Sequence, residues 1–149
     1  MNDKDKVIIT KLRGFLKEMA SEYPIEIVFL YGSFASVYHH AGSDIDIGIF
    51  FSESVEKAEK AHFFITEITY KLIQEFSREV NIISIDRNFL HPMLYYNVII
   101  SGIPLFIKDD GKFLSLKLEA IHQMEDFQLF APFWQRTVTK KIMKGVSYG

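Results

Sequence analysis

The residues best suited to chemistry are two aspartates separated by one residue, Asp44 and Asp46. On a β-strand, residues i and i+2 lie on the same face with Cβ atoms roughly 6–7 Å apart, so both carboxylates would share one side of a strand. Two like charges this close are costly unless solvent or a cation neutralises them. Carboxylate oxygens are hard ligands that suit Mg²⁺, which usually binds one or two carboxylates together with waters and substrate phosphates.

A Gly-Ser pair, Gly32 and Ser33, precedes these aspartates. Gly32 lets the backbone approach a ligand closely, and Ser33 offers a hydroxyl and an N–H group. A helix beginning there would add partial positive charge at its N-terminus, which favours a phosphate. Alone, a Gly-Ser pair usually marks a turn and an Asp-x-Asp pair an exposed strand face. The combination of a strand, a Gly-Ser turn, a fixed gap and an Asp-x-Asp strand favours a functional site.

Four apolar or alternating segments predict the strands that would hold these residues. We expect strands over Ile25–Tyr31, Ser43–Phe51, Val80–Ile85 and Ile103–Ile107. Helical spacing predicts a helix over Lys4–Glu22 and a second helix from an N-cap at Ser52 or Ser54 to about Phe76. A third is expected from Pro92 at N1 to Gly102 at C′, and a fourth from Lys112 to about Lys144 with a break or kink at Pro132. A short helical turn is expected over Phe34–Tyr38. This order predicts an α/β (α+β) fold, in which helices pack on a small mixed sheet.

Composition narrows the functional classes. A length of 149 residues, 48% of them apolar, suits a single domain over 1–149 with a C-terminal helical segment from about 112. The absence of cysteine excludes disulfides, thiolate metal ligands and cysteine nucleophiles. A formal net charge of −2 argues against direct nucleic-acid binding. There is neither a signal-peptide pattern nor a run of about 20 apolar residues, so we expect a cytoplasmic protein without membrane contact.

The spacing Gly32-Ser33-x10-Asp44-x-Asp46 resembles the signature of the polymerase-β-type nucleotidyltransferase superfamily. The small size is similar to that of its minimal (MNT) members, in particular the MntA-type antitoxins of HEPN–MNT toxin–antitoxin pairs. From about Lys11 to Lys108 the chain can be laid on the family pattern. The resemblance therefore implies a nucleotidyltransferase-like fold.

For such a protein the resemblance implies transfer of AMP from ATP to a tyrosine hydroxyl of a cognate HEPN toxin, an RNase. By position, Asp44 and Asp46 would be the catalytic residues and would hold Mg²⁺ against the triphosphate. Gly32 and Ser33 would bind the phosphates of the nucleotide. Catalysis would consist mainly of positioning and charge neutralisation at the attacked phosphorus.

Two departures from the family pattern bear on activity. The family usually has a third carboxylate where Asn81 stands; an amide oxygen ligates Mg²⁺ only weakly and cannot accept a proton. Loss of a positioned general base costs about 10²–10⁴-fold in rate, although Glu79 could substitute if the strand register allowed it. The second departure is the Phe34–Ser36 segment, which lacks the arginine that relatives often carry after Gly-Ser. His39 and His40 either replace that cation or form a solvated loop pair.

Two alternatives remain open. In one, the protein is an antitoxin weakened or inactivated through Asn81 that neutralises its toxin by binding. In the other, it is a transferase acting on a small-molecule hydroxyl such as that of an aminoglycoside. The aromatic segment Phe127–Trp134 has more apolar side chains than one helix face can bury, so part of it can contact a toxin or a second copy of the chain.

Overall fold

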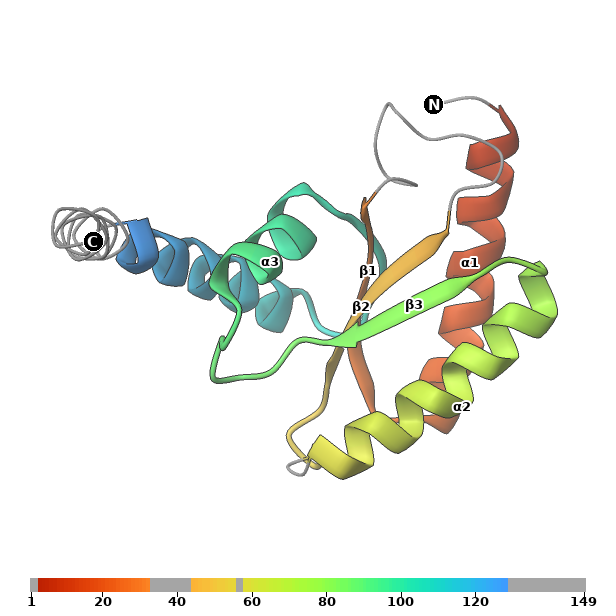
Figure 1. The fold of residues 1–149 in the computed structure, drawn as a ribbon, viewed down its shortest axis with the longest axis horizontal. Coiled ribbons are helices and arrows are strands. Elements are labelled where there is room, and N and C mark those ends of the chain that lie inside the picture. Colours follow the sequence, from red (N-terminus) through yellow and green to blue (C-terminus); the bar gives the residue numbers. More distant parts are fainter. Residues whose placement is uncertain (1–2, 33–43, 56–57, 129–149) are drawn as a thin grey trace, which may run out of the picture.

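A mixed four-stranded sheet lies at the centre of the computed structural model, which describes residues 3–32, 44–55 and 58–128 (Figure 1). The elements are α1 (Asp3–Glu22), β1 (Ile25–Tyr31), β2 (Ile45–Phe51), α2 (Ala58–Phe76), β3 (Val80–Ser84), α3 (Pro92–Tyr96), the π-helical turn η2 (Asn97–Ser101) and β4 (Ile103–Ile107). A further helix covers 110–128. The strand order is β3-β2-β1-β4. This arrangement confirms the predicted α/β (α+β) fold.

The sheet mixes two kinds of pairing. β1 is antiparallel to both β2 and β4, whereas β2 and β3 are parallel and are joined by α2. A parallel pair needs such a crossover, while antiparallel strands do not. As a consequence, the end of β1 and the starts of β2 and β3 meet at one edge of the sheet.

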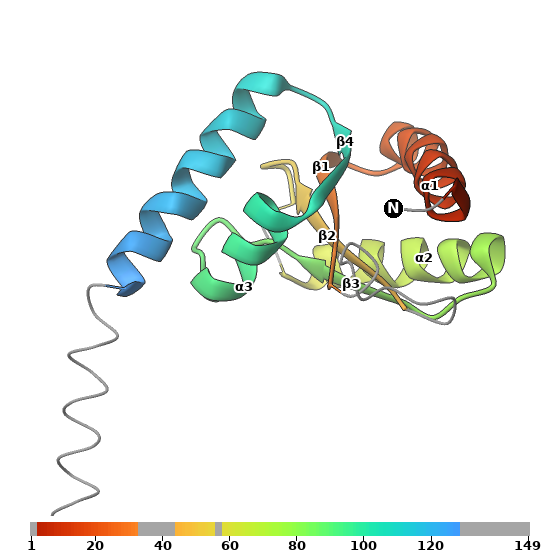
Figure 2. The same ribbon diagram turned by 90° about the horizontal axis from the view of Figure 1, so that it is seen from above.

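Helices cover both faces of the sheet (Figure 2). α1 and α2 lie on one face, and α3, η2 and the helix over 110–128 lie on the other. Along β2 the first face buries Ile45, Ile47, Ile49 and Phe51. Because side chains alternate along a strand, Asp44 and Asp46 belong to the opposite face, as the sequence pattern predicts.

The predicted strand bounds hold best where the chain is almost entirely apolar, with Glu26 the one charged residue in β1 and none in β4. β1 and β4 begin and end at the predicted residues, and β1 is buried over all but its last residue. β1 lies in the middle of a sheet covered on both faces, where a strand reads as a nearly continuous apolar run. β2 begins at Ile45 rather than Ser43, and β3 ends at Ser84 rather than Ile85.

The predicted N-cap at Ser52 or Ser54 is wrong. Ser52 continues the pairing of the strands, since its N–H donates to the carbonyl of Pro24 at 2.9 Å. The chain then turns, and Val55 donates to Ser52 O at 3.0 Å before α2 is reached. The two serine hydroxyls hydrogen-bond each other at 2.7 Å. Both hydroxyls therefore belong to the turn rather than to the first turn of the helix.

The segment after Pro92 is helical, as predicted, with proline in its first turn, but its second half widens into the π-helical turn η2. Gly102 follows the turn, yet its φ of −76° is not the left-handed conformation of a C′ glycine. It is required for another reason. A Cβ at this position would overlap Val98 O and lie 2.9 Å from Leu30 O. Gly102 thus allows η2 to pack closely on β1.

The helix over 110–128 begins slightly before the predicted Lys112, because Asp109 is an N-cap that the sequence pattern did not reveal. Its Oδ1 accepts hydrogen bonds from the N–H groups of Gly111 at 2.8 Å and Lys112 at 3.1 Å. Lys112 also pairs with the buried Glu26 of β1, at 3.3 Å, which fixes the helix to the sheet.

Several predictions fall outside the described residues. These are the helical turn over Phe34–Tyr38, the break at Pro132, the helix beyond 128 and most of the aromatic segment Phe127–Trp134. Within the described helices, none is both long enough and apolar enough to cross a membrane.

Candidate active site at the acidic edge of the sheet

The polar side chains of Tyr31, Asp46 and Asn81 stand in a row at the edge of the sheet where β1 ends and β2 and β3 begin. We call this the acidic edge and define it by Tyr31, Gly32, Asp44, Asp46 and Asn81. Tyr31 pairs with Asp46 across the antiparallel β1–β2 ladder, and Asp46 pairs with Asn81 across the parallel β2–β3 ladder. Directly paired residues point to the same face of a sheet, so the register places Asp46 between a phenol and an amide.

Asp46 and Asn81 are joined by a hydrogen bond. The amide Nδ2 of Asn81 donates to Oδ1 of Asp46 at 3.1 Å. Asn81 is exposed and Asp46 is half-buried, so the pair lies at the surface of the sheet edge. Each carboxylate oxygen has two lone pairs, so Oδ1 can still accept a second contact.

Gly32 brings the backbone against the other oxygen of Asp46. Its φ of +73° is in the left-handed region, which favours glycine because a Cβ would clash there. A Cβ on Gly32 would also overlap Oδ2 of Asp46 and lie 3.2 Å from its Cγ. The chain therefore leaves β1 directly over the carboxylate, and no other residue type fits this position without strain.

Asp44 is half-buried and lies directly before β2. The N–H of the next residue, Ile45, donates to Glu79 O at 2.9 Å, which ties the start of β2 to the start of β3. Glu79 is exposed and precedes β3. It contributes this carbonyl to the sheet edge, but the residue paired with Asp46 is Asn81 and not Glu79.

Tyr31 is a neighbour that the sequence pattern did not single out. Burial, and then the nearby charge of Asp46, raise the pKa of the Tyr31 phenol above its usual value of 10.0. The phenol is thus held in its protonated form, in which it can donate a hydrogen bond. The only sequence signal was its place directly before Gly32, because strand pairing, not spacing, brings it beside Asp46.

The structure brings together four of the five predicted site residues: Gly32, Asp44, Asp46 and Asn81. Ser33 lies outside the described residues, as do Phe34, Ser36, His39 and His40. Among the residues that are described, no three His, Asp or Glu side chains gather closely enough to hold a metal ion by themselves. The acidic edge therefore offers two carboxylates and one amide as oxygen-bearing groups.

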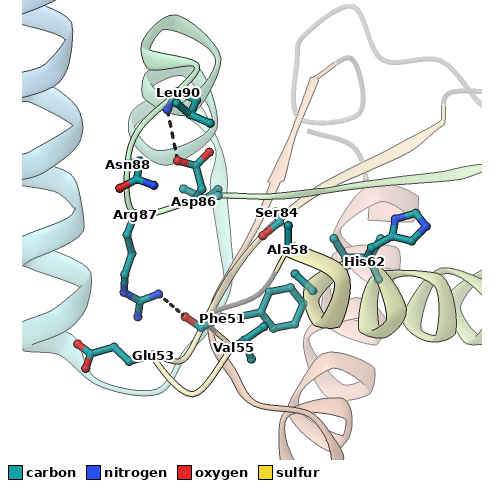
Figure 3. Close-up of a pocket in the computed structure, with 13 residues that line it drawn as sticks. Phe51, Glu53, Val55, Ala58, His62, Ser84, Asp86, Arg87, Asn88 and Leu90 are labelled. Atoms are coloured by element: carbon teal, nitrogen blue, oxygen red, sulfur yellow. Dashed lines mark hydrogen bonds between the residues drawn. The ribbon is translucent and has the colours of Figure 1, made fainter.

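A large cavity lies elsewhere among the described residues. It has a volume of about 780 Å³ and is at the opposite end of β2, between the start of α2 and the loop after β3 (Figure 3). Figure 3 shows Arg87 and Glu53 on one side of this cavity and His62, from α2, on the other. We call this region the cavity end.

Two charged groups of the cavity end, Arg87 and Asp86, are engaged with the protein itself. Arg87 donates to Phe51 O at 3.2 Å and lies over the ring of Phe50, 4.5 Å from its centroid. Asp86 accepts from the N–H of Leu90 at 3.3 Å and from the hydroxyl of Tyr95. Both side chains thus hold the loop after β3 in place, so size alone does not make this cavity the better candidate.

The residues of the acidic edge lie within a match to a known protein family. The model of the family described as polymerase beta, nucleotidyltransferase, matches residues 15–111, which include every residue of that edge. Comparison with curated proteins gave no significant sequence match.

Solved structures with a similar fold include components of toxin–antitoxin complexes. One is a toxin–antitoxin with AMP-PNP, with a TM-score of 0.66, 16% identity and coverage of 85% of this chain and 98% of that chain. Another is the MntA–HepT toxin–antitoxin, with a TM-score of 0.64, 14% identity and coverage of 87% and 98%. A third is a tri-AMPylated Shewanella oneidensis HEPN toxin in complex with MNT antitoxin, with a TM-score of 0.64, 14% identity and coverage of 88% and 98%.

Proposed function

Since the chain belongs to the polymerase beta-type nucleotidyltransferase family, we propose that it is the antitoxin of a HEPN–MNT pair and transfers AMP from ATP to a tyrosine of its toxin. The observation that carries this proposal is the placement of Asp46 against Gly32, beside Asp44, inside the region that matches the family. The similar structures support the same assignment, since one was solved with AMP-PNP and another with an AMPylated toxin.

The residues of the acidic edge fit a divalent cation such as Mg²⁺. Asp44 and Asp46 supply hard carboxylate oxygens. Gly32 lets the backbone lie against Oδ2 of Asp46, where a Cβ would overlap that oxygen. When bound, the cation would neutralise charge on the triphosphate and make the α-phosphorus more electrophilic. In the proposal, Asp44 and Asp46 hold it, and Gly32 and Ser33 bind phosphate oxygens.

In the proposed reaction the tyrosine oxygen of the toxin attacks the α-phosphorus of ATP. A P–O bond to tyrosine forms, the bond to the β-phosphate oxygen breaks, pyrophosphate leaves, and the tyrosine proton passes to solvent or to an aspartate. Asn81 takes no part in proton transfer because an amide is not a base at neutral pH. Formation of the toxin–antitoxin complex compensates in part, because a held acceptor reacts at a high effective concentration.

One observation favours a second candidate function, neutralisation of the toxin by binding alone. Asn81 stands where a carboxylate is expected, so the acidic edge has one negative charge fewer for binding cations. An antitoxin of this kind would bind its toxin tightly but leave its tyrosines unmodified.

A single experiment separates these functions. The protein is incubated with the HEPN protein encoded beside it, ATP and Mg²⁺, and the partner is then weighed by mass spectrometry. We expect added AMP mass with the wild type and none with Asp46→Asn, which keeps the shape of the side chain but removes its charge. A stable complex with no added mass, even at high protein concentration, would support binding alone and contradict AMP transfer.

A further inference from the structure

The hydrogen bond between Asn81 and Asp46 turns the amide nitrogen of Asn81, rather than its oxygen, toward Asp46. Nδ2, a donor, is 3.1 Å from Oδ1 of Asp46. An amide nitrogen carries partial positive charge and has no lone pair to offer a cation. The atom of Asn81 that lies beside Asp46 therefore serves to hold Asp46 and is not a metal ligand, whereas a carboxylate oxygen there could be one.

The same contact removes the need for a cation between β2 and β3. Two carboxylates at this separation would repel each other unless a cation lay between them. An amide and a carboxylate attract each other without help, and a hydrogen bond to a charged acceptor is stronger than one between neutral groups. Asp46 is thus held in one orientation by Asn81 on one side and by the backbone of Gly32 on the other.

We propose that Asn81 is a positioning residue that fixes Asp46 for a single divalent cation, so that the site takes one cation per bound nucleotide rather than two. This inference rests on the proposed function, because it assumes that nucleotide and cation bind at the acidic edge. It assigns Asn81 a role different from that of a weak metal ligand. The sequence position alone could not decide between these roles, because the orientation of the amide depends on the strand pairing.

The ratio of cation to nucleotide tests the proposal directly. The full chain is dialysed to equilibrium against Mn²⁺ and AMP-PNP, and the manganese and nucleotide retained by the protein are measured separately. We expect a ratio of about one for the wild type and about two for Asn81→Asp, because the new carboxylate completes a second cation site.

Thermal melting provides a readout that does not involve catalysis. Without metal, Asn81→Asp places two carboxylates side by side and should lower the melting temperature by about 3 °C. Added Mn²⁺ should restore this loss in Asn81→Asp and have a smaller effect on the wild type. The matched control is Asn88→Asp, the same change on the exposed loop beyond β3, whose melting temperature should not depend on Mn²⁺ in this way.

Asn81→Ala separates positioning from charge. It removes the donor without adding a carboxylate, so the ratio should stay at about one while the affinity for Mn²⁺ with AMP-PNP falls about fivefold. An unchanged affinity would overturn the positioning role.

A ratio of two in the wild type would overturn the single-cation proposal while leaving AMP transfer intact. A ratio of one in Asn81→Asp without any Mn²⁺-dependent melting shift would overturn it as well. Other results would contradict the proposed function itself. In that case the wild type retains neither AMP-PNP nor Mn²⁺, or no AMP appears on the partner although the ratio is one.

Discussion

The two ends of β2 carry polar groups that are used in opposite ways. At the cavity end, Arg87 and Asp86 form hydrogen bonds with neighbouring loops and with Tyr95. At the acidic edge, Asp46 accepts a hydrogen bond from Asn81 and lies beside Tyr31 and the backbone of Gly32. The cavity end has the larger space, whereas the acidic edge has charges with capacity left for a ligand.

The contrast concerns whether the charges at each end are already bonded within the protein, and not how large a cavity they line. Charged side chains that already form hydrogen bonds within the protein stabilise the loop that they belong to. They can bind a ligand only if those hydrogen bonds break, which costs about 1–3 kcal/mol for each buried group. At the acidic edge, Gly32 instead allows the backbone to approach the carboxylate of Asp46 closely. We therefore expect the rate of AMP transfer to depend on the acidic edge and the free energy of unfolding to depend on the cavity end.

The largest expected effect is on AMP transfer. Asp46→Ala should lower the rate at least about 10³-fold, because it removes charge that the proposed mechanism places at the reacting phosphates. The rate is measured by mass spectrometry of the partner. Arg87→Ala, at the cavity end, should leave the rate within about twofold of the wild type, because Arg87 holds a loop. Equal losses in both variants would contradict the distinction between the two ends.

Asn81→Asp should raise the rate of AMP transfer about tenfold, because it restores a carboxylate that can accept a proton and bind a second cation. The same mass-spectrometric assay, run as a time course, measures the change. A rate that stays the same or falls would indicate that another group, such as Glu79, already fills this role.

Gly32→Ala should weaken AMP-PNP binding and lower the free energy of unfolding by about 1–2 kcal/mol, since the new Cβ meets Asp46 in a backbone conformation that disfavours alanine. Urea denaturation and equilibrium dialysis measure the two effects. Gly14→Ala is the matched control. Gly14 is exposed on α1, and a Cβ added there would meet nothing within 4 Å, so this change should stabilise the protein by about 1 kcal/mol.

Tyr95→Phe should have a smaller effect, confined to stability. It removes the hydroxyl that binds Asp86 and lies 3.3 Å from Ser84 O, and should lower the free energy of unfolding by about 1 kcal/mol at neutral pH. AMP transfer should not change. Loss of transfer without loss of stability would mean that the cavity end takes part in function.

The effect of Tyr95 should also depend on pH. Burial raises the pKa of Tyr95 from 10.0 to about 12. Because the folded state holds this proton more tightly than the unfolded state, the stabilisation is complete below pH 10 and is lost as the pH rises through about 12. Urea denaturation at about pH 9 and about pH 11 should therefore show a steeper loss of stability for the wild type than for Tyr95→Phe.

The sequence predicts the limits of the strands well, but it predicts poorly the contacts that residues such as Ser52 make with distant parts of the chain. β1 and β4 are apolar runs bounded by breakers, so local pattern sets their limits. The hydroxyl of Ser52 could serve as a helix cap, which is why the pattern predicts one, but pairing with Pro24 keeps this residue extended. That competition depends on a residue far away in the chain, which a local pattern does not contain.

The candidate site shows the same division. The spacing of Asp44 and Asp46 predicts that they share a face, because strand geometry has a fixed period. The place of Tyr31 beside Asp46 and the direction of the Asn81 amide follow from strand register and side-chain rotamer. Both features depend on how the strands pair in the folded protein, so the spacing of residues in the sequence could not predict them.

Gly48, midway along β2, lies under η2. A methyl group there would come within 2.6 Å of Cγ1 of Val98, whose side chain is fully buried. The two positions are therefore coupled in volume, and alanine at 48 fits only where residue 98 becomes smaller. Gly48→Ala should destabilise the protein alone but much less together with Val98→Ala. In related chains of this fold, a bulkier residue in the middle of the second strand should accordingly be accompanied by a smaller one in the helix above it.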